Sequence, residues 1–273
     1  MNVEMLDAIE PSSLVKERYD FNDFIRMVRL LRSPEGCPWD REQTHASIRK
    51  NFIEETYEVL EAIDNGDLSL LREELGDVLL QIGLHVEMES ELGRMSFEDV
   101  ITELCKKLVQ RHPHVFGDVA AENVPQVLNN WETIKMRTKG QSTYEASLRS
   151  VPASFPALMR AQKLLSRAAR AGFAPPDVQT ALAQADVCQK RLCRSSLESA
   201  SADVVECALG DSLFALVGLA QQLGIDAEEA LTRAGQRFTE QFARMERAAL
   251  KQNKSLHELS YEEQCSLFAA EEN

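Results

Sequence analysis

Two pairs of carboxylates dominate the chemistry available to the first half of the chain. Glu55 and Glu58 lie three residues apart, and Glu74 and Asp77 repeat that spacing farther along. Residues three apart on an α-helix differ by about 60° around its axis, so each pair shares one face. Carboxylate oxygens without histidine or cysteine beside them suit Mg²⁺ or Mn²⁺ better than zinc. The pattern therefore predicts a site for a hard divalent cation, provided that the two helices meet.

Two consecutive amphipathic helices must position these carboxylates. Helical periodicity covers residues 48–65 and 68–92, and Asn65-Gly66 between them is a helix stop signal. Helices joined by so short a turn pack antiparallel, which brings both carboxylate pairs to one interface. The core stripe of the second helix is expected at four apolar positions, Leu75, Val78, Leu79 and Ile82.

Other interpretations fit the acidic spacing. Most acidic helix faces are solvated surfaces that bind nothing, and like charges at this spacing destabilise an isolated helix by only a few tenths of a kcal/mol. A di-iron carboxylate bundle needs Glu-x-x-His pairs, which are absent from the two acidic segments. The sequence also lacks the P-loop pattern, so metals and basic side chains would have to hold the phosphates of any bound nucleotide.

Several basic and aromatic side chains are candidates for binding an anionic ligand. Lys107 and Arg111 are spaced i, i+4 on a helix expected to start after Ser96, and they form either a phosphate-binding pair or an ordinary basic surface. Arg49 begins the first acidic helix and is a further candidate. Trp39 either stacks on a base or fills the core.

Helical periodicity covers most of the chain and predicts an all-α fold. Further helices are expected at 21–32, 96–110, 124–137, 157–171, 177–200, 202–223 and 227–251. We assign residues 18–138 to a first domain, 139–156 to a linker, 157–252 to a second domain and 253–273 to a weakly packed acidic tail.

An internal repeat at an offset of 134 residues supports two related halves. Leu75-Gly76-Asp77 recurs as Leu209-Gly210-Asp211, and Trp39 corresponds to Phe173. Coincidence between leucine-rich helices is the alternative. The acids mostly do not recur, because Glu54, Glu55, Glu58 and Glu74 correspond to Cys188, Gln189, Leu192 and Ala208. Asp211 alone cannot hold a pair of Mg²⁺ ions, so the second half is expected to have lost catalysis.

Composition narrows the class of protein. Thirty basic and 44 acidic residues give a net charge of −14, which disfavours binding to nucleic acid. The longest apolar stretches, such as 213–220, are far shorter than the ~20 residues that span a bilayer, so no membrane partner is expected. The six cysteines form no CxxC pair and residues 1–16 lack a signal-peptide pattern. We therefore expect a cytoplasmic protein with reduced, buried thiols.

Taken in order, several stretches resemble the MazG-type nucleoside triphosphate pyrophosphohydrolases. The matching stretches are 36–45, 54–59, 71–77, 111–116 and 156–163. The family signature, Glu-x-x-Glu followed by Glu-x-x-Asp, falls on Glu55, Glu58, Glu74 and Asp77. This resemblance implies that the four carboxylates are metal ligands.

The same resemblance implies a fold, an activity and partners. The fold would consist of two tandem units of four to five helices, and the protein would form homodimers. The activity would be Mg²⁺-dependent hydrolysis of a nucleoside triphosphate to the monophosphate and pyrophosphate, in housecleaning of the nucleotide pool. Glu54 would orient or deprotonate the attacking water beside Glu55 and Glu58, and Lys107 and Arg111 would face the phosphates.

The intact acidic set lies in the first half, so we expect activity there and an accessory role for the second half. The alternative is a helical regulator that binds a nucleotide or a protein and has little catalytic activity.

Overall fold

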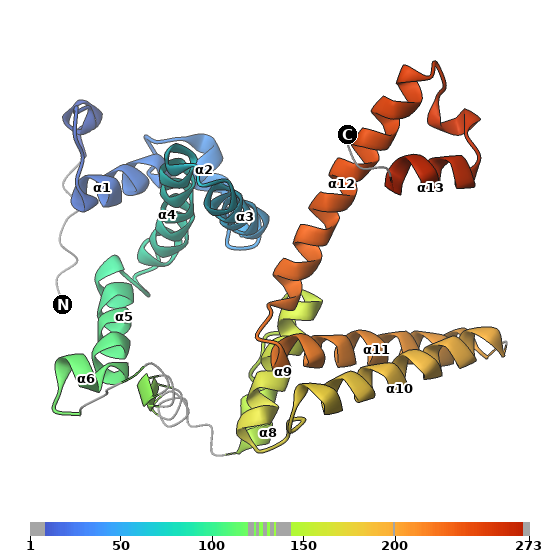
Figure 1. Ribbon diagram of the computed structural model, residues 1–273. Coiled ribbons are helices and arrows are strands. Elements are labelled where there is room, and N and C mark those ends of the chain that lie inside the picture. The colour runs from blue at the N-terminus through green and yellow to red at the C-terminus, as the bar shows by residue number, and fades with distance from the viewer. Residues whose placement is uncertain are drawn as a thin grey trace. The chain divides into compact units, whose positions relative to one another are not determined.

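The computed structural model describes residues 9–119 and 143–269, except Ser199, and a few isolated positions from 123 to 134. Every regular element among the described residues is a helix, which confirms the all-α expectation (Figure 1). Packing divides the chain into a first unit, residues 1–131, and a second unit, residues 132–273. The helix expected at 124–137 and the start of the expected linker lie largely outside the described residues.

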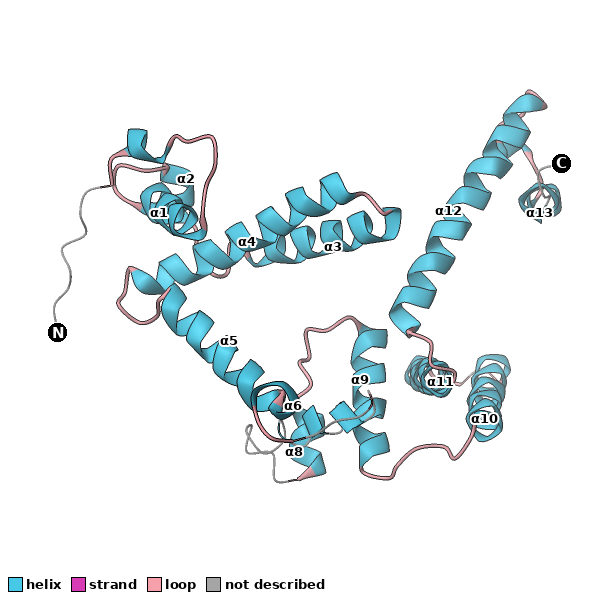
Figure 2. Ribbon diagram, turned by 60° about the vertical axis from the view of Figure 1, so that its left-hand side comes forward, coloured by secondary structure: helices cyan, strands magenta, loops and turns pink. Residues whose placement is uncertain are grey.

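The first unit is built around one antiparallel helical hairpin. Its elements are η1 (Pro11–Leu14), α1 (Phe21–Arg32), α2 (Pro38–Glu42), α3 (Arg49–Asn65), α4 (Leu68–Ser90), α5 (Phe97–Arg111) and α6 (Pro113–Phe116). Helices α3 and α4 lie side by side along their length, and α1 packs on α4 (Figure 2). The four long helices begin and end within two residues of the predicted bounds. We did not predict η1, α2 and α6, because elements this short carry no periodic signal.

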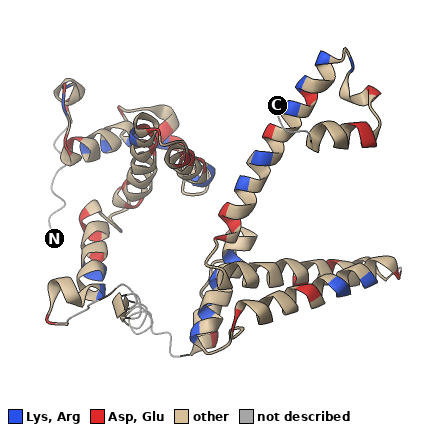
Figure 3. Ribbon diagram, viewed as in Figure 1, with Lys and Arg blue, Asp and Glu red and all other residues tan. Residues whose placement is uncertain are grey.

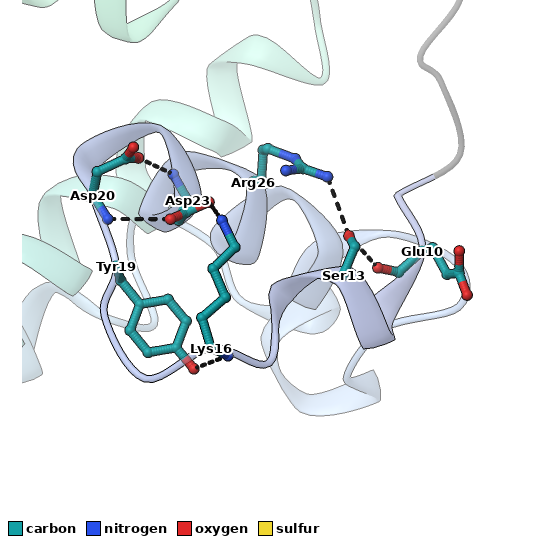
Figure 4. Close-up of polar contacts among 7 residues, drawn as sticks. All are labelled: Glu10, Ser13, Lys16, Tyr19, Asp20, Asp23 and Arg26. Carbon is teal, nitrogen blue, oxygen red and sulfur yellow. Dashed lines mark hydrogen bonds and ion pairs between the residues drawn. The ribbon is translucent and has the colours of Figure 1, made fainter.

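Polar contacts fix the start of α1 and the segment before it (Figure 4). Asp20 and Asp23 form a reciprocal capping box, in which each side chain accepts a hydrogen bond from the other's backbone N–H. The Lys16 ammonium lies 2.6 Å from the Asp23 carboxylate and holds the pKa of that carboxyl below its ordinary value. Arg26 donates a hydrogen bond of 3.3 Å to the Ser13 hydroxyl. The chain therefore enters α1 in one defined direction.

The hydrophobic core of the first unit lies where α1 crosses the second half of α4. Four buried residues form it, namely Val28, Ile48, Leu84 and Met88. Gly83 permits this close approach, because a Cβ there would lie 2.8 Å from the ring of Phe24. The expected core stripe in the first half of α4 is only partly correct, since Leu75 is 52% exposed. The other three positions, Val78, Leu79 and Ile82, are only half-buried, so the described residues do not fully enclose the stripe.

The second unit repeats the order of the first. Its elements are α8 (Tyr144–Arg149), α9 (Ala157–Arg170), α10 (Val178–Leu197), α11 (Ala202–Gln222), α12 (Ala227–Lys251), η2 (Leu256–Glu258) and α13 (Tyr261–Ala269). Helices α10 and α11 form the second hairpin, and α9 packs on α11 as α1 packs on α4. Helix α8 lies in the range expected to be linker and is joined to α9, because Arg167 donates a 2.7 Å hydrogen bond to the Ser150 hydroxyl.

The segment after α12, which we expected to be a weakly packed acidic tail, contains two short helical elements. It forms η2 and α13, and α13 folds back on α12. Leu259 is buried, and the Phe268 ring lies 5.5 Å from the ring of Phe238. The segment is therefore helical as far as residue 269, although α13 itself contains no buried residue.

Two other sequence-based expectations can be compared with the structure. None of the described helices combines the length and the apolar character needed to cross a bilayer. All six cysteines are unpaired, but Cys105, Cys193, Cys207 and Cys265 are exposed, so the expectation of buried thiols is wrong for these four.

Candidate functional site

The turn between α3 and α4 sets the geometry of the acidic residues. Gly66 ends α3 in the left-handed region, with φ +65°, where a side chain would be strained. Asp67 then caps α4, because its carboxylate accepts hydrogen bonds from the backbone of Ser69 at 2.9 Å and of Leu70 at 3.1 Å. The chain reverses within two residues, so the inner faces of the helices lie opposite each other.

This reversal brings the carboxylates of the two helices together. Glu55 and Glu58 from α3 and Glu74 from α4 each offer an oxygen, and these oxygens all lie within 4.8 Å of one another. Glu74 is only 7% exposed, Glu55 is half-buried and Glu58 is exposed. Asp77 lies one turn beyond Glu74 and close enough for its charge to act on Glu55 and Glu74. Figure 3 shows acidic positions on both helices of the hairpin.

Electrostatic strain accompanies this arrangement. Loss of hydration raises the pKa of Glu55, and the neighbouring charges of Asp77 and Glu58 raise it further. Loss of hydration also raises the pKa of Glu74, followed by the effect of Glu58. Within the described part of the chain, no lysine, arginine or histidine forms an ion pair with any of these four carboxylates.

A divalent cation with a preference for oxygen fits such a site. Several ionised carboxylates at this distance repel one another, and the repulsion ends when a cation shares their oxygens. The donor set contains carboxylates alone, which matches Mg²⁺ or Mn²⁺ and does not match zinc. The raised pKa values and the absence of a protein cation beside the described carboxylates make metal binding the simplest compensation.

Glu54 occupies the same helix but a different environment. Its carboxylate is exposed and lies 2.9 Å from the ammonium of Lys50, one turn earlier on α3. The sequence-based prediction placed Glu54 with Glu55 and Glu58 and did not anticipate this ion pair. An exposed pair of this kind contributes little to stability and opens readily, so Glu54 can leave Lys50 when another group needs it.

Trp39 lies on α2, where its side chain is 60% exposed and does not fill the core. The segment that carries it is fixed by Arg32, which donates hydrogen bonds to the backbone oxygens of Asp40 at 2.6 Å and Gln43 at 3.2 Å. The guanidinium of Arg32 also forms a two-pronged ion pair with Glu91, at 2.6 and 3.0 Å. Arg32 therefore holds α2 against the end of α4.

The predicted basic residues are not gathered around the carboxylates within one chain. Arg49 is exposed at the first position of α3. Lys107 is exposed on α5, and the guanidinium of Arg111 lies 5.3 Å from the centre of the Trp131 ring. In the described residues, none of the three forms an ion pair with Glu55, Glu58, Glu74 or Asp77.

Sequence reasoning missed a histidine pair that joins the loop before α3 to α4. The Nδ1 atoms of His45 and His85 lie 2.7 Å apart, and the two rings stack at 5.0 Å. Nε2 of His45 lies 2.7 Å from the Glu89 carboxylate, which also binds Arg94 at 2.7 Å. Burial and the neighbouring His45 lower the pKa of His85. The two histidines are far apart in the sequence, and no local pattern indicated this contact.

The second hairpin carries one counterpart of these acids. Asp211 on α11 corresponds to Asp77, and its carboxylate lies 3.1 Å from the guanidinium of Arg191 on α10. Where α3 has its acids, α10 has Cys188, Gln189 and Leu192. Among its described residues, the second unit therefore lacks the convergence of acidic side chains that the first unit has.

Known proteins resemble both halves of the chain. A family profile described as the MazG nucleotide pyrophosphohydrolase domain matches residues 43–116. A nucleoside triphosphate pyrophosphohydrolase of Escherichia coli strain K12 is 42% identical over 228 residues, which cover 82% of this chain and 86% of the relative. A nucleoside triphosphate pyrophosphohydrolase/pyrophosphatase MazG of Thermotoga maritima is 38% identical over 242 residues, which cover 89% and 91%. A nucleoside triphosphate pyrophosphohydrolase of Mycobacterium tuberculosis is 34% identical over 183 residues, which cover 64% and 54%.

Proposed function

The chain belongs to the family of MazG nucleotide pyrophosphohydrolases, and from this premise we propose that its carboxylate site hydrolyses nucleoside triphosphates to monophosphates and pyrophosphate. The protein is thus a hydrolase that acts in housecleaning of the nucleotide pool. One observation carries the assignment to a site, namely the meeting of Glu55, Glu58 and Glu74 within 4.8 Å inside the matched residues 43–116.

We propose Glu55, Glu58, Glu74 and Asp77 as the ligands of Mg²⁺, with Mn²⁺ as a substitute. When bound, the cation neutralises the repulsion between these carboxylates and the triphosphate and withdraws electrons from the phosphoryl group under attack. The raised pKa values of Glu55 and Glu74 support this assignment, because a group that is costly to ionise alone gains most from a nearby cation.

Glu54 is proposed to position the attacking water and to accept its proton. Its exposed carboxylate lies next to the cluster on α3 and its ion pair with Lys50 is open to solvent, so it is free to change partner. Trp39 is proposed to stack on the base, since an aromatic ring 60% exposed on a firmly held segment has surface to offer. Arg49, Lys107 and Arg111 are proposed to bind the phosphates.

We propose that the protein acts as a homodimer. On α3 the side chains of Ile53, Tyr57 and Leu60 recur at i, i+4 and i+7, and each is about half exposed, as is Leu75 on α4. An apolar stripe of this kind on the catalytic hairpin is typical of an interface. A second copy would cover this stripe. It could also bring Lys107 and Arg111 on its α5 close to the carboxylates of the first copy. Light scattering on the purified protein measures the mass that tests this.

The two units are proposed to have different roles. The first holds the four acids and performs the reaction, whereas the second retains only Asp211, which is paired with Arg191. We therefore assign an accessory role to the second unit. The proposed location is the cytoplasm, where the nucleoside triphosphate pool is found.

The test is release of pyrophosphate from a panel of nucleoside triphosphates, measured on the full chain with Mg²⁺ and with EDTA. We expect turnover with Mg²⁺ only, and loss of at least a hundredfold in kcat for Glu55→Gln and for Asp77→Asn. Glu61→Gln is the matched control, because Glu61 is an exposed acid on α3 outside the cluster. Stabilisation by Mg²⁺ without turnover would favour the regulator instead, and no response to Mg²⁺ would refute both the activity and the metal site.

A further inference from the structure

The second unit contains a cavity at the place where the repeat would put a nucleotide. Phe173, Cys188 and Asp211 correspond to Trp39, Glu54 and Asp77 at the offset of 134 residues, and all three line one cavity of about 730 Å³. Cavities that bind small molecules in proteins have volumes of roughly 300–1,000 Å³. The duplicated hairpin has therefore kept a space of the right size after losing its acids.

The walls of this cavity are apolar and largely fixed. Leu165 of α9, Phe214 and Gly218 of α11 and the loop 172–176 contribute to the lining. The loop is held in place, because Gln222 donates a hydrogen bond of 3.1 Å to the Pro175 oxygen and the Phe173 N–H donates one of 3.0 Å to the oxygen of Ala168. A preformed apolar wall lowers the free energy needed to order a site on binding.

Phe173 is largely exposed and is not buried against the described residues around it. Its side chain is 79% exposed although it belongs to the lining of an apolar cavity. Trp39, its counterpart in the first unit, is also mostly exposed. An exposed aromatic ring at the edge of a cavity offers a flat surface on which a base can stack.

The charge of the cavity differs from that of the acidic site. Besides the Cys188 thiol, the described lining contains one ionisable side chain, Asp211. The Arg191 guanidinium lies 3.1 Å from the Asp211 carboxylate and balances its charge. Lys190, the residue before Arg191 on α10, forms an ion pair of 2.6 Å between its ammonium and the Asp186 carboxylate. A triphosphate with its cation would find in this described lining a single carboxylate, already paired with Arg191, and no unpaired cation. Thr180, Gln184 and Asp211 offer polar groups for a neutral ligand.

We propose that this cavity binds the nucleoside part of a nucleotide, a heterocyclic base with its sugar, without a metal ion. Phe173 stacks on the base, and Thr180, Gln184 and Asp211 supply hydrogen bonds. The choice of a nucleoside rests on the function proposed for the first unit, because the repeat relates this cavity to the site that handles nucleotides there. The described lining offers no unpaired cation to a phosphate, so each added phosphate loses hydration without a partner and affinity falls from nucleoside to monophosphate to triphosphate when metal is absent.

The experiment is a titration of the full chain with 2-aminopurine riboside, a fluorescent purine nucleoside that is quenched on stacking, in buffer with EDTA. We expect saturable quenching that Phe173→Ala weakens about tenfold or more, as loss of a stacking ring does elsewhere. Ala183→Leu adds bulk to the lining at an exposed position of α10 and is expected to weaken binding as well. Competition by adenosine, its monophosphate and its triphosphate measures the effect of each phosphate.

Matched controls keep the result specific. Leu197→Ala removes an apolar side chain that is 84% exposed at the end of α10, away from the lining, and is expected to leave quenching unchanged. Circular dichroism checks that each variant remains helical. Trp39→Ala is titrated in the same way to measure any stacking of the probe in the first unit, and a loss of all saturable quenching in that variant would overturn the proposal by placing the probe there.

Other outcomes would also overturn it. Absence of saturable quenching refutes the proposal. A Phe173→Ala variant that binds the probe as tightly as wild type also refutes it. The same holds if this variant changes the oligomeric mass of the protein without changing its affinity for the probe. A second copy would in that last case be the true occupant of the cavity. Pyrophosphate release with Mg²⁺ is measured separately, so an active enzyme that does not bind the nucleoside refutes this inference alone. A chain that binds the nucleoside in EDTA but releases no pyrophosphate refutes the proposed reaction alone.

Discussion

Replacement of Arg32 by methionine is expected to loosen the segment that carries Trp39. The guanidinium makes two hydrogen bonds to backbone oxygens of this segment and a two-pronged ion pair with Glu91. Methionine fills the buried space but supplies no donor. The two carbonyl bonds are worth about 1 kcal/mol each after exchange with water. The ion pair adds about 1 kcal/mol, because the Glu91 side chain is 38% exposed and becomes hydrated when Arg32 is lost.

The expected loss in the free energy of unfolding of the first unit is therefore about 3 kcal/mol. Urea unfolding followed by tryptophan fluorescence measures it selectively, since both tryptophans, Trp39 and Trp131, belong to the first unit. With a dependence on urea of about 1–3 kcal/mol per molar, the midpoint falls by roughly 1–3 M. Arg41→Met is the matched control, because Arg41 is exposed and makes a single hydrogen bond, to the oxygen of Pro34.

Kinetics provide a second readout of the same variant. We expect Arg32→Met to raise KM for the triphosphate and to change kcat little, because the segment with Trp39 moves while the carboxylates on α3 and α4 stay in place. A loss of stability below about 0.5 kcal/mol, or one equal to that of Arg41→Met, would refute the assignment of these hydrogen bonds. A fall in kcat at constant KM would show that Arg32 acts through the acidic hairpin instead.

Three further changes test other parts of the molecule. Burial and the charge of Glu58 raise the pKa of Glu74, so the free energy of unfolding falls as pH rises and Glu74 becomes ionised. Glu74→Gln removes this charge and should raise the melting temperature in EDTA at pH 7. The increase should become smaller toward pH 4.5, where Glu74 is protonated in the wild type. A variant that melts lower than wild type at pH 7 would contradict this. Asp67→Ala removes the cap of α4 and should lower stability by about 1 kcal/mol in urea, whereas no change would mean that the turn is held otherwise. Leu259→Ala should lower the free energy of unfolding of the second unit by about 2 kcal/mol, measured by thermal unfolding. An unchanged melting curve would mean that the segment after α12 packs weakly on the rest of the unit.

Local signals were sufficient for the long helices and for the shape of the acidic hairpin. Helix α5 starts after Ser96 as predicted, with Ser96 and Asp99 in a reciprocal capping box, and Gly66 ends α3 where the stop signal lies. Spacing within each helix and the short turn between them were enough to bring Glu55 close to Glu74. These features depend on neighbouring residues alone, which is why a single sequence reveals them.

Features that depend on distant residues could not be predicted. The ion pair of Glu54 with Lys50 competes with a place in the cluster, and periodicity does not say which contact a flexible side chain will adopt. His45 meets His85 only because α3 and α4 are packed, so no local pattern announces the pair. Leu75 belongs to an apolar stripe and is nevertheless half exposed, because such a stripe has the same sequence pattern whether it faces the core of its own chain or another molecule.

The tight reversal at Gly66 and Asp67 has a consequence for how such a protein folds and evolves. The converging acids lie within residues 55–77, so their meeting requires closure of one short loop and belongs to the fastest class of folding events. A site encoded in one short stretch is also copied whole when the gene segment is duplicated. One copy can then keep the chemistry while the other accumulates substitutions such as Cys188 and Ala208 without harming the first. Duplication thus leaves an old framework free to acquire a different ligand.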